Sequence, residues 1–151
     1  MGTSKDGRLE PRRVCVSKNK LLPNGKTVLL TESEPSLRRL VSNVLARENC
    51  RVISACDGKR ALATAARHDC AIELFVTDVV LPGFYGCHLA ELLKFDYPQI
   101  EVIYLASFTD RDIRALACES KVILVQDSGW TDALVAAVRN VLSSSEFADV
   151  A

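Results

Sequence analysis

Five short apolar runs, each followed by a segment with helical spacing, most constrain what this chain can fold into. The expected strands are Thr27–Thr31, Arg51–Ala55, Leu74–Thr77, Glu101–Leu105 and Val122–Gln126. These runs are largely continuous rather than alternating, and such runs are typical of strands that are buried on both faces. The pattern therefore predicts a parallel sheet that is covered by helices on both sides.

The segments between the runs have the periodicity of amphipathic helices. In the first of them, apolar residues fall at i, i+3, i+4, i+7 and i+8, namely Leu37, Leu40, Val41, Val44 and Leu45. Pro35 suits the first turn of this helix, and Ser33 or Glu34 is the expected cap. Further helices are expected around residues 61–66, 89–93, 113–117 and 133–142. We therefore predict a doubly wound α/β fold with the flavodoxin-like strand order 2-1-3-4-5.

The ends of the chain differ in composition from this repeating part. Residues 1–26 are rich in polar and basic residues and are expected to be a flexible leader or linker. The domain is expected over residues 27–142, and residues 143–151 are expected to be a C-terminal tail. A stand-alone regulator and a domain of a longer protein both fit this organisation.

Composition excludes several classes of function. The 151 residues carry a formal net charge of +0, so nothing in the charge balance indicates nucleic acid as a partner. No apolar run is long enough to cross a bilayer, and the polar N-terminus does not resemble a secretory signal. The six cysteines form no C-x-x-C pair and are expected to be free thiols in a reducing cytoplasm. The two histidines, His68 and His88, have no partner at metal-ligand spacing and are expected on the surface.

Acidic residues follow three of the expected strands. Glu32, Asp78 and Asp127 each come directly after a strand or end it. In an open parallel sheet, ligands bind beyond the carboxyl ends of the strands, so these side chains are expected to share one cleft. Carboxylates gathered there can hold Mg²⁺, and one of them can form an aspartyl phosphate. The alternative interpretation is that all three are solvated loop residues.

Several stretches of the sequence resemble the receiver domain of two-component response regulators, the CheY-like superfamily. The resemblance rests on Thr27–Pro35, Asp57–Leu62, Thr77–Gly86 and Phe108–Asp110, in this order and at the expected spacing. It implies that Asp78 is the phosphoacceptor and that acids after the first strand hold Mg²⁺ together with Asp78. It also implies a hydroxyl residue after the fourth strand and a lysine after the fifth, both of which contact the phosphoryl group.

The chain departs from the family pattern at four positions. Ser33 replaces the second acid, Ala106 the hydroxyl, Leu124 the switch aromatic and Asp127 the lysine, whereas Glu32 keeps the first acid. An anion in place of a cation at ~5 Å from a phosphoryl group costs several kcal/mol at an effective dielectric of ~20. We therefore expect no stable aspartyl phosphate. Because Ser33 removes one acidic ligand, we also expect a weak or absent Mg²⁺ site, whose candidate ligands are Glu32, Asp78 and Asp127.

Three functions are compatible with these residues. The first is a degenerate receiver domain, not an enzyme, that acts through protein–protein contacts. The second is a conventional receiver that is phosphorylated on Asp78 by a partner histidine kinase. The third is an unrelated ligand-binding or enzymatic role on a flavodoxin-like fold. Partners and homodimers of the family use the face of the fourth helix, fifth strand and fifth helix, which here carries Phe108, Arg111, Arg114, Leu124 and Trp130. Simple packing is the alternative role for Trp130.

Overall fold

The computed structural model describes residues 25–67, 71–106, 121–125 and 128–150. Its strands are β1 (Lys26–Thr31), β2 (Cys50–Ala55), β3 (Leu74–Asp78), β4 (Val80–Leu81), β5 (Phe84–Tyr85), β6 (Glu101–Ala106) and β7 (Lys121–Leu124). Its helices are α3 (Pro35–Arg47), α4 (Gly58–Arg67), α5 (Gly86–Asp96) and α7 (Trp130–Val150). The fourth expected helix, around residues 113–117, lies outside the described residues.

One sheet of five parallel strands forms the centre of the molecule. Its order is β2-β1-β3-β6-β7, and every neighbouring pair in it is parallel. Counted among themselves, these five strands have the order 2-1-3-4-5, so the predicted doubly wound topology is confirmed. This order places the ends of β1 and β3 side by side at the point where the chain reverses its direction of winding.

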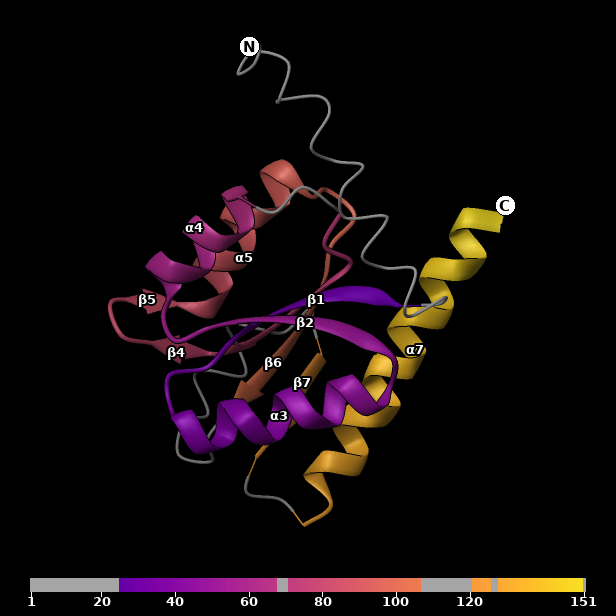
Figure 1. The fold of residues 1–151 in the computed structure, drawn as a ribbon, viewed down its shortest axis with the longest axis horizontal. Coiled ribbons are helices and arrows are strands. Elements are labelled where there is room, and N and C mark those ends of the chain that lie inside the picture. The colour runs from indigo at the N-terminus through magenta and orange to yellow at the C-terminus, as the bar shows by residue number, and fades with distance from the viewer. Residues whose placement is uncertain (1–24, 68–70, 107–120, 126–127, 151) are drawn as a thin grey trace, which may run out of the picture.

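Helices cover both faces of the sheet, with α4 and α5 on one side and α3 and α7 on the other (Figure 1). Alternate residues of each strand therefore enter different cores. In β3, for example, Phe75 packs in the cluster under α4 and α5, whereas Leu74 and Val76 pack in the cluster under α3 and α7. Burial on both faces explains why the strands read as continuous apolar runs.

The start of α3 follows the prediction. Glu34 is the cap, and its Oε1 accepts a hydrogen bond of 2.7 Å from the backbone N–H of Leu37. Pro35 occupies the first turn, where backbone N–H groups have no partner within the helix, so the missing N–H of proline costs no helical hydrogen bond. At the start of α4, Asp57 Oδ1 accepts a 2.8 Å bond from the Arg60 backbone in the same way. Both helices thus begin immediately beyond a strand end.

Two local features depart from the simple alternation of strands and helices. β4 and β5 pair in antiparallel fashion around Pro82 and Gly83, so the segment after β3 contains a small hairpin. Gly83 has φ of +75°, which suits the position after a proline in a tight turn. At the C-terminus, α7 continues to Val150, so residues 143–150, the expected C-terminal tail, are helical. Only Glu146 and Ala148 in this stretch are strong helix formers, so the extension does not follow from helix propensity.

The remaining expectations concern thiols, histidines and membrane spans. Cys50, Cys56 and Cys87 are free, and burial raises the pKa of the Cys50 thiol to about 11. His88 is exposed as expected, with its ring edge-on to Tyr85, whereas His68 and the other three cysteines lie outside the described residues. Among the described helices, none combines the length and apolar character that a bilayer crossing needs.

Candidate functional site

Glu32 and Asp78 come together at the ends of β1 and β3. The two strands pair in register up to Thr31 and Thr77, and an acidic residue follows each. Glu32 is 2% exposed, and its backbone N–H donates a 3.1 Å hydrogen bond to the carbonyl of Ala55 in β2. The structure therefore brings these two predicted site residues into one acidic pair, in which Glu32 is buried and Asp78 is half-buried.

The neighbouring Glu32 carboxyl makes Asp78 harder to ionise. The pKa of Asp78 is raised to about 8, first by burial and then by the hydrogen bond with Glu32 and the charge of Glu32. A hydrogen bond from the Ser33 backbone acts in the opposite direction and lowers this pKa. Glu32 Oε2 accepts a 3.1 Å bond from the Glu34 backbone, but the buried Oε1 accepts no hydrogen bond from the described residues. A proton or a cation between the two carboxyls would remove this deficit.

The acidic pair supplies only part of a metal site. The unpartnered Glu32 Oε1 beside Asp78 offers hard oxygen ligands of the kind that Mg²⁺ prefers. Ser33, which stands where the family has its second acid, is exposed. No group of three potential ligands occurs among the residues that the structure describes, and the third predicted ligand, Asp127, lies outside them. Glu32 and Asp78 would thus hold a cation with two carboxylates.

Apolar side chains occupy the end of β6. Ala106 is the last residue of this strand, is 2% exposed and pairs with Leu124 of β7. Both side chains pack in the cluster under α4 and α5. The described residues therefore offer no hydroxyl at this strand end and no aromatic ring on β7. Ser107 lies outside the described residues.

The segment after Asp78 is tightly built. The Thr77 hydroxyl donates a 2.9 Å hydrogen bond to the Asp78 carbonyl, and the Gly86 backbone donates a 2.7 Å bond to the Val79 carbonyl. A Cβ atom at Gly86 would collide with the Asp78 carbonyl oxygen. Gly86 therefore permits the first turn of α5 to close directly on the backbone of the predicted phosphoacceptor.

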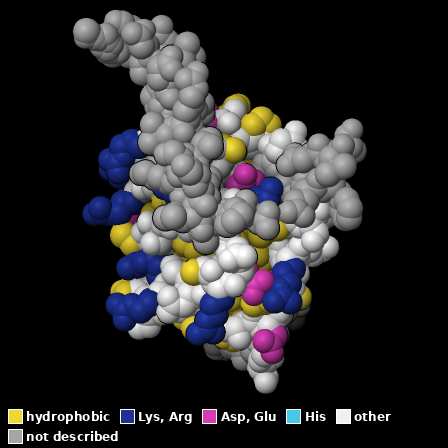
Figure 2. Space-filling model, turned by 45° about the vertical axis from the view of Figure 1, so that its right-hand side comes forward, with side chains coloured by type: hydrophobic (Ala, Val, Ile, Leu, Met, Phe, Trp, Pro, Cys, Tyr) yellow, Lys and Arg dark blue, Asp and Glu magenta, His cyan; other side chains and the backbone are white. Residues whose placement is uncertain are grey.

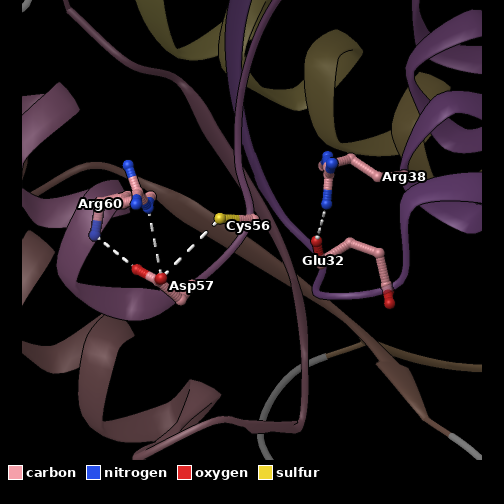
Figure 3. A network of polar contacts seen from close by, with 5 residues as sticks. All are labelled: Glu32, Arg38, Cys56, Asp57 and Arg60. Carbon is pink, nitrogen blue, oxygen red and sulfur yellow. Dashed lines mark hydrogen bonds and ion pairs between the residues drawn. The ribbon is translucent and has the colours of Figure 1, made fainter.

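Sequence reasoning did not find the contacts around Arg38. This side chain reaches from α3 across to β1, and its Nη1 donates a 2.9 Å hydrogen bond to the Glu32 carbonyl (Figure 3). Nearby, Asp57 accepts a 3.7 Å contact from the Cys56 thiol and forms a 3.5 Å ion pair with Arg60. Arg38 lies one turn into the helix that follows Glu32, and this spacing is the only sequence signal that could have indicated the contact.

The predicted partner face is described only in part. Phe108, Arg111 and Arg114 lie outside the described residues. Trp130 is half-buried and packs against the cluster under α3 and α7, which fits a packing role. The structure therefore does not test a dimer through this face.

The fold and the strand-end carboxylates define a doubly wound α/β protein with its site at the switch point. A family model, the response regulator receiver domain, matches residues 28–125. The chain therefore belongs to the receiver domains of two-component response regulators. Receiver domains are generally signalling modules that interact with histidine kinases and other proteins, and they typically bind Mg²⁺ at the phosphorylation site.

Relatives and solved structures agree with this family. The response regulator GtcR of Aneurinibacillus migulanus is 31% identical over 87 residues, which cover 58% of this chain and 35% of that protein. The probable transcriptional regulatory protein TcrX of Mycobacterium tuberculosis is 33% identical over 81 residues, which cover 54% of this chain and 34% of that protein. The chain thus spans about a third of the length of these two relatives.

The similar structures show the fold alone, because their sequences are distant. A receiver domain from Clostridium thermocellum has a TM-score of 0.71 at 18% identity and covers 81% of this chain and 98% of its own. The response regulator TrrA of Thermotoga maritima, crystallised in complex with Mg(2+)-BeF, has a TM-score of 0.64 at 21% identity. This match covers 77% of this chain and 98% of that structure's chain.

Proposed function

We propose that this receiver domain, over residues 27–142, signals in the cytoplasm through protein contacts and needs no stable phosphoryl group on Asp78. The observation that carries the proposal is the buried Ala106 beside Leu124, where the family has a hydroxyl that binds the phosphoryl group. A methyl group cannot donate a hydrogen bond. A hydrogen bond to a charged group stabilises it by about 1.5–3 kcal/mol, so its absence disfavours the aspartyl phosphate.

The second acid of the family site is also missing. Ser33 has a neutral side chain, so it brings no charge to the pair formed by Glu32 and Asp78. It is also exposed. A divalent cation held by two carboxylates would neutralise less of the charge on an incoming phosphoryl group than the family site does. Asp127, as a replacement ligand, would restore part of the cation affinity, but it would also repel the phosphoryl group. In this proposal the domain is a signalling module and not an enzyme.

A conventional phosphoacceptor is the second candidate function. The acidic pair of Glu32 and Asp78, with the unpartnered Glu32 Oε1, favours it because the nucleophile and one metal ligand are in place. When bound, Mg²⁺ would supply charge neutralisation, and the chain's own task would be to present an ionised Asp78 carboxylate. A partner histidine kinase would then be the phosphoryl donor.

One assay separates the two candidates. The protein is incubated with acetyl phosphate or phosphoramidate and Mg²⁺, and its intact mass is measured, with Asp78→Asn as the control. We expect no added phosphoryl mass on the folded wild type. An added mass on the wild type but not on the control would overturn the proposal and establish the conventional function.

A further inference from the structure

An arginine-lined groove runs beside β2, and Arg38 connects it to the backbone of Glu32. It has a volume of about 490 Å³, and its lining residues are Arg38, Ser54, Ala55, Cys56, Arg60, Ala63, Thr64 and Arg67. None of these side chains is acidic. Figure 2 shows several Lys and Arg side chains on one face of the molecule, with few Asp or Glu side chains among them. Because three lining residues are arginines and none is acidic, the groove is a concave surface of positive charge.

Its arginines come from two helices on opposite faces of the sheet. Arg60, Thr64 and Arg67 stand at i, i+4 and i+7 on α4 and so share one face of that helix. Arg38 approaches from α3. The groove thus wraps the edge of the sheet, where β2 has only β1 as a neighbour among the described strands.

The arginines are only partly neutralised from within the chain. Arg60 is 71% exposed, and its one ion pair with a described residue is with Asp57. Arg38 donates to a neutral carbonyl, that of Glu32, and forms no ion pair within the described part of the chain. Arg67 is exposed and has no ion pair among the described residues. Three guanidinium groups around one groove favour carboxylates, with which arginine forms two parallel hydrogen bonds.

We propose that this groove binds an extended acidic segment of a protein partner. Among the described strands β2 lies at the edge of the sheet, and a strand edge can accept an extended backbone through its N–H and C=O groups. Acidic side chains of that segment pair with Arg60 and Arg67 on α4. Arg38 links the groove to the Glu32 carbonyl at the end of β1, so the occupant contacts the neighbourhood of the acidic pair.

The groove would be the partner surface for the function proposed above, and its role in signalling rests on that function. Peptide binding by the groove is measured without a phosphoryl donor, so it can fail independently of the phosphorylation assay. A fluorescein-labelled polyglutamate peptide is titrated with the full chain, and fluorescence anisotropy is measured at low salt. A labelled polylysine peptide serves as the charge control.

Two matched double variants locate the binding. Arg60→Glu with Arg67→Glu reverses two charges in the groove, whereas Arg39→Glu with Arg47→Glu reverses two exposed charges on α3 outside it. We expect the groove variant to weaken polyglutamate binding at least tenfold and the α3 variant to weaken it less than threefold, by about the loss that net charge alone produces. Circular dichroism confirms that both variants are folded.

A backbone readout completes the test. On adding polyglutamate, the amide resonances of Ser54, Ala55 and Cys56 are expected to shift, because they line the groove. Equal weakening by the two double variants, tighter binding of polylysine, or amide shifts confined to other elements would each overturn the proposal.

Discussion

The acidic pair and the arginine groove lie near each other, but their charged side chains differ in exposure to solvent. Glu32 is 2% exposed and is fixed by strand pairing, whereas Arg60 is 71% exposed and stands on a helix surface. Charge in the acidic pair costs folding free energy, because desolvation and repulsion act on it. Charge in the groove costs little and remains available for binding. Substitutions in the first region should therefore change stability, and substitutions in the second should change affinity.

The largest effect is expected at Gly86, which closes the acidic site. Gly86→Ala brings a Cβ atom against the Asp78 carbonyl oxygen, and we expect a loss of about 3 kcal/mol in the free energy of unfolding. Urea denaturation measures it. Gly83→Ala is the control, because its Cβ meets nothing and only the positive φ is strained, at about 1 kcal/mol. Equal losses for the two variants would contradict the close approach.

Asp78→Asn should stabilise the protein in the absence of divalent cations. The pKa of Asp78 is raised to about 8 in the folded chain and is near ~4 in the unfolded chain. Between these values the folded state binds more protons, so its stability falls as pH rises through this window. We expect the variant to lose this slope and to gain about 2 kcal/mol at alkaline pH.

Urea denaturation in EDTA, from about pH 5 to about pH 9, measures this slope. Asp57→Asn removes the same charge outside the acidic pair and should keep the slope of the wild type. A slope that survives in Asp78→Asn would mean that another group causes it.

Ala106→Thr should restore part of the family's chemistry. The new hydroxyl can donate to a phosphoryl oxygen on Asp78, so with acetyl phosphate and Mg²⁺ we expect a detectable phosphoryl mass on the variant, where the wild type shows none. Intact mass measures the yield. Ala106→Val has a similar volume without the hydroxyl and is the control. If the two variants behaved alike, the missing hydroxyl would not limit phosphorylation.

The smallest effect on stability is expected in the groove. Arg67→Gln removes an exposed charge that has no ion pair among the described residues, so the free energy of unfolding should change by less than about 0.5 kcal/mol. Thermal denaturation checks this. A loss comparable to that of Gly86→Ala would show that the groove is part of the folding core, and the contrast between the two regions would fail.

The sequence by itself determined the topology and the position of the acidic pair. Continuous apolar runs identify strands buried on both faces, and the order 2-1-3-4-5 then places the ends of β1 and β3 together. Glu32 and Asp78 follow those two strands, so their meeting could be predicted from position alone. The hairpin around Gly83 and the extension of α7 to Val150 could not be predicted, because neither continues the apolar pattern of the strands and helices.

Only the tertiary structure decided how charge is distributed around that pair. The contact of Arg38 with the Glu32 carbonyl joins α3 to β1, and no sequence period specifies which arginine of α3 turns inward. The groove joins Arg38 of α3 with Arg60 and Arg67 of α4 around the edge of β2. Sequence patterns report which face of each element is apolar. The separation between polar side chains on different elements is set by the packing of those elements, and it exists only once the chain has folded.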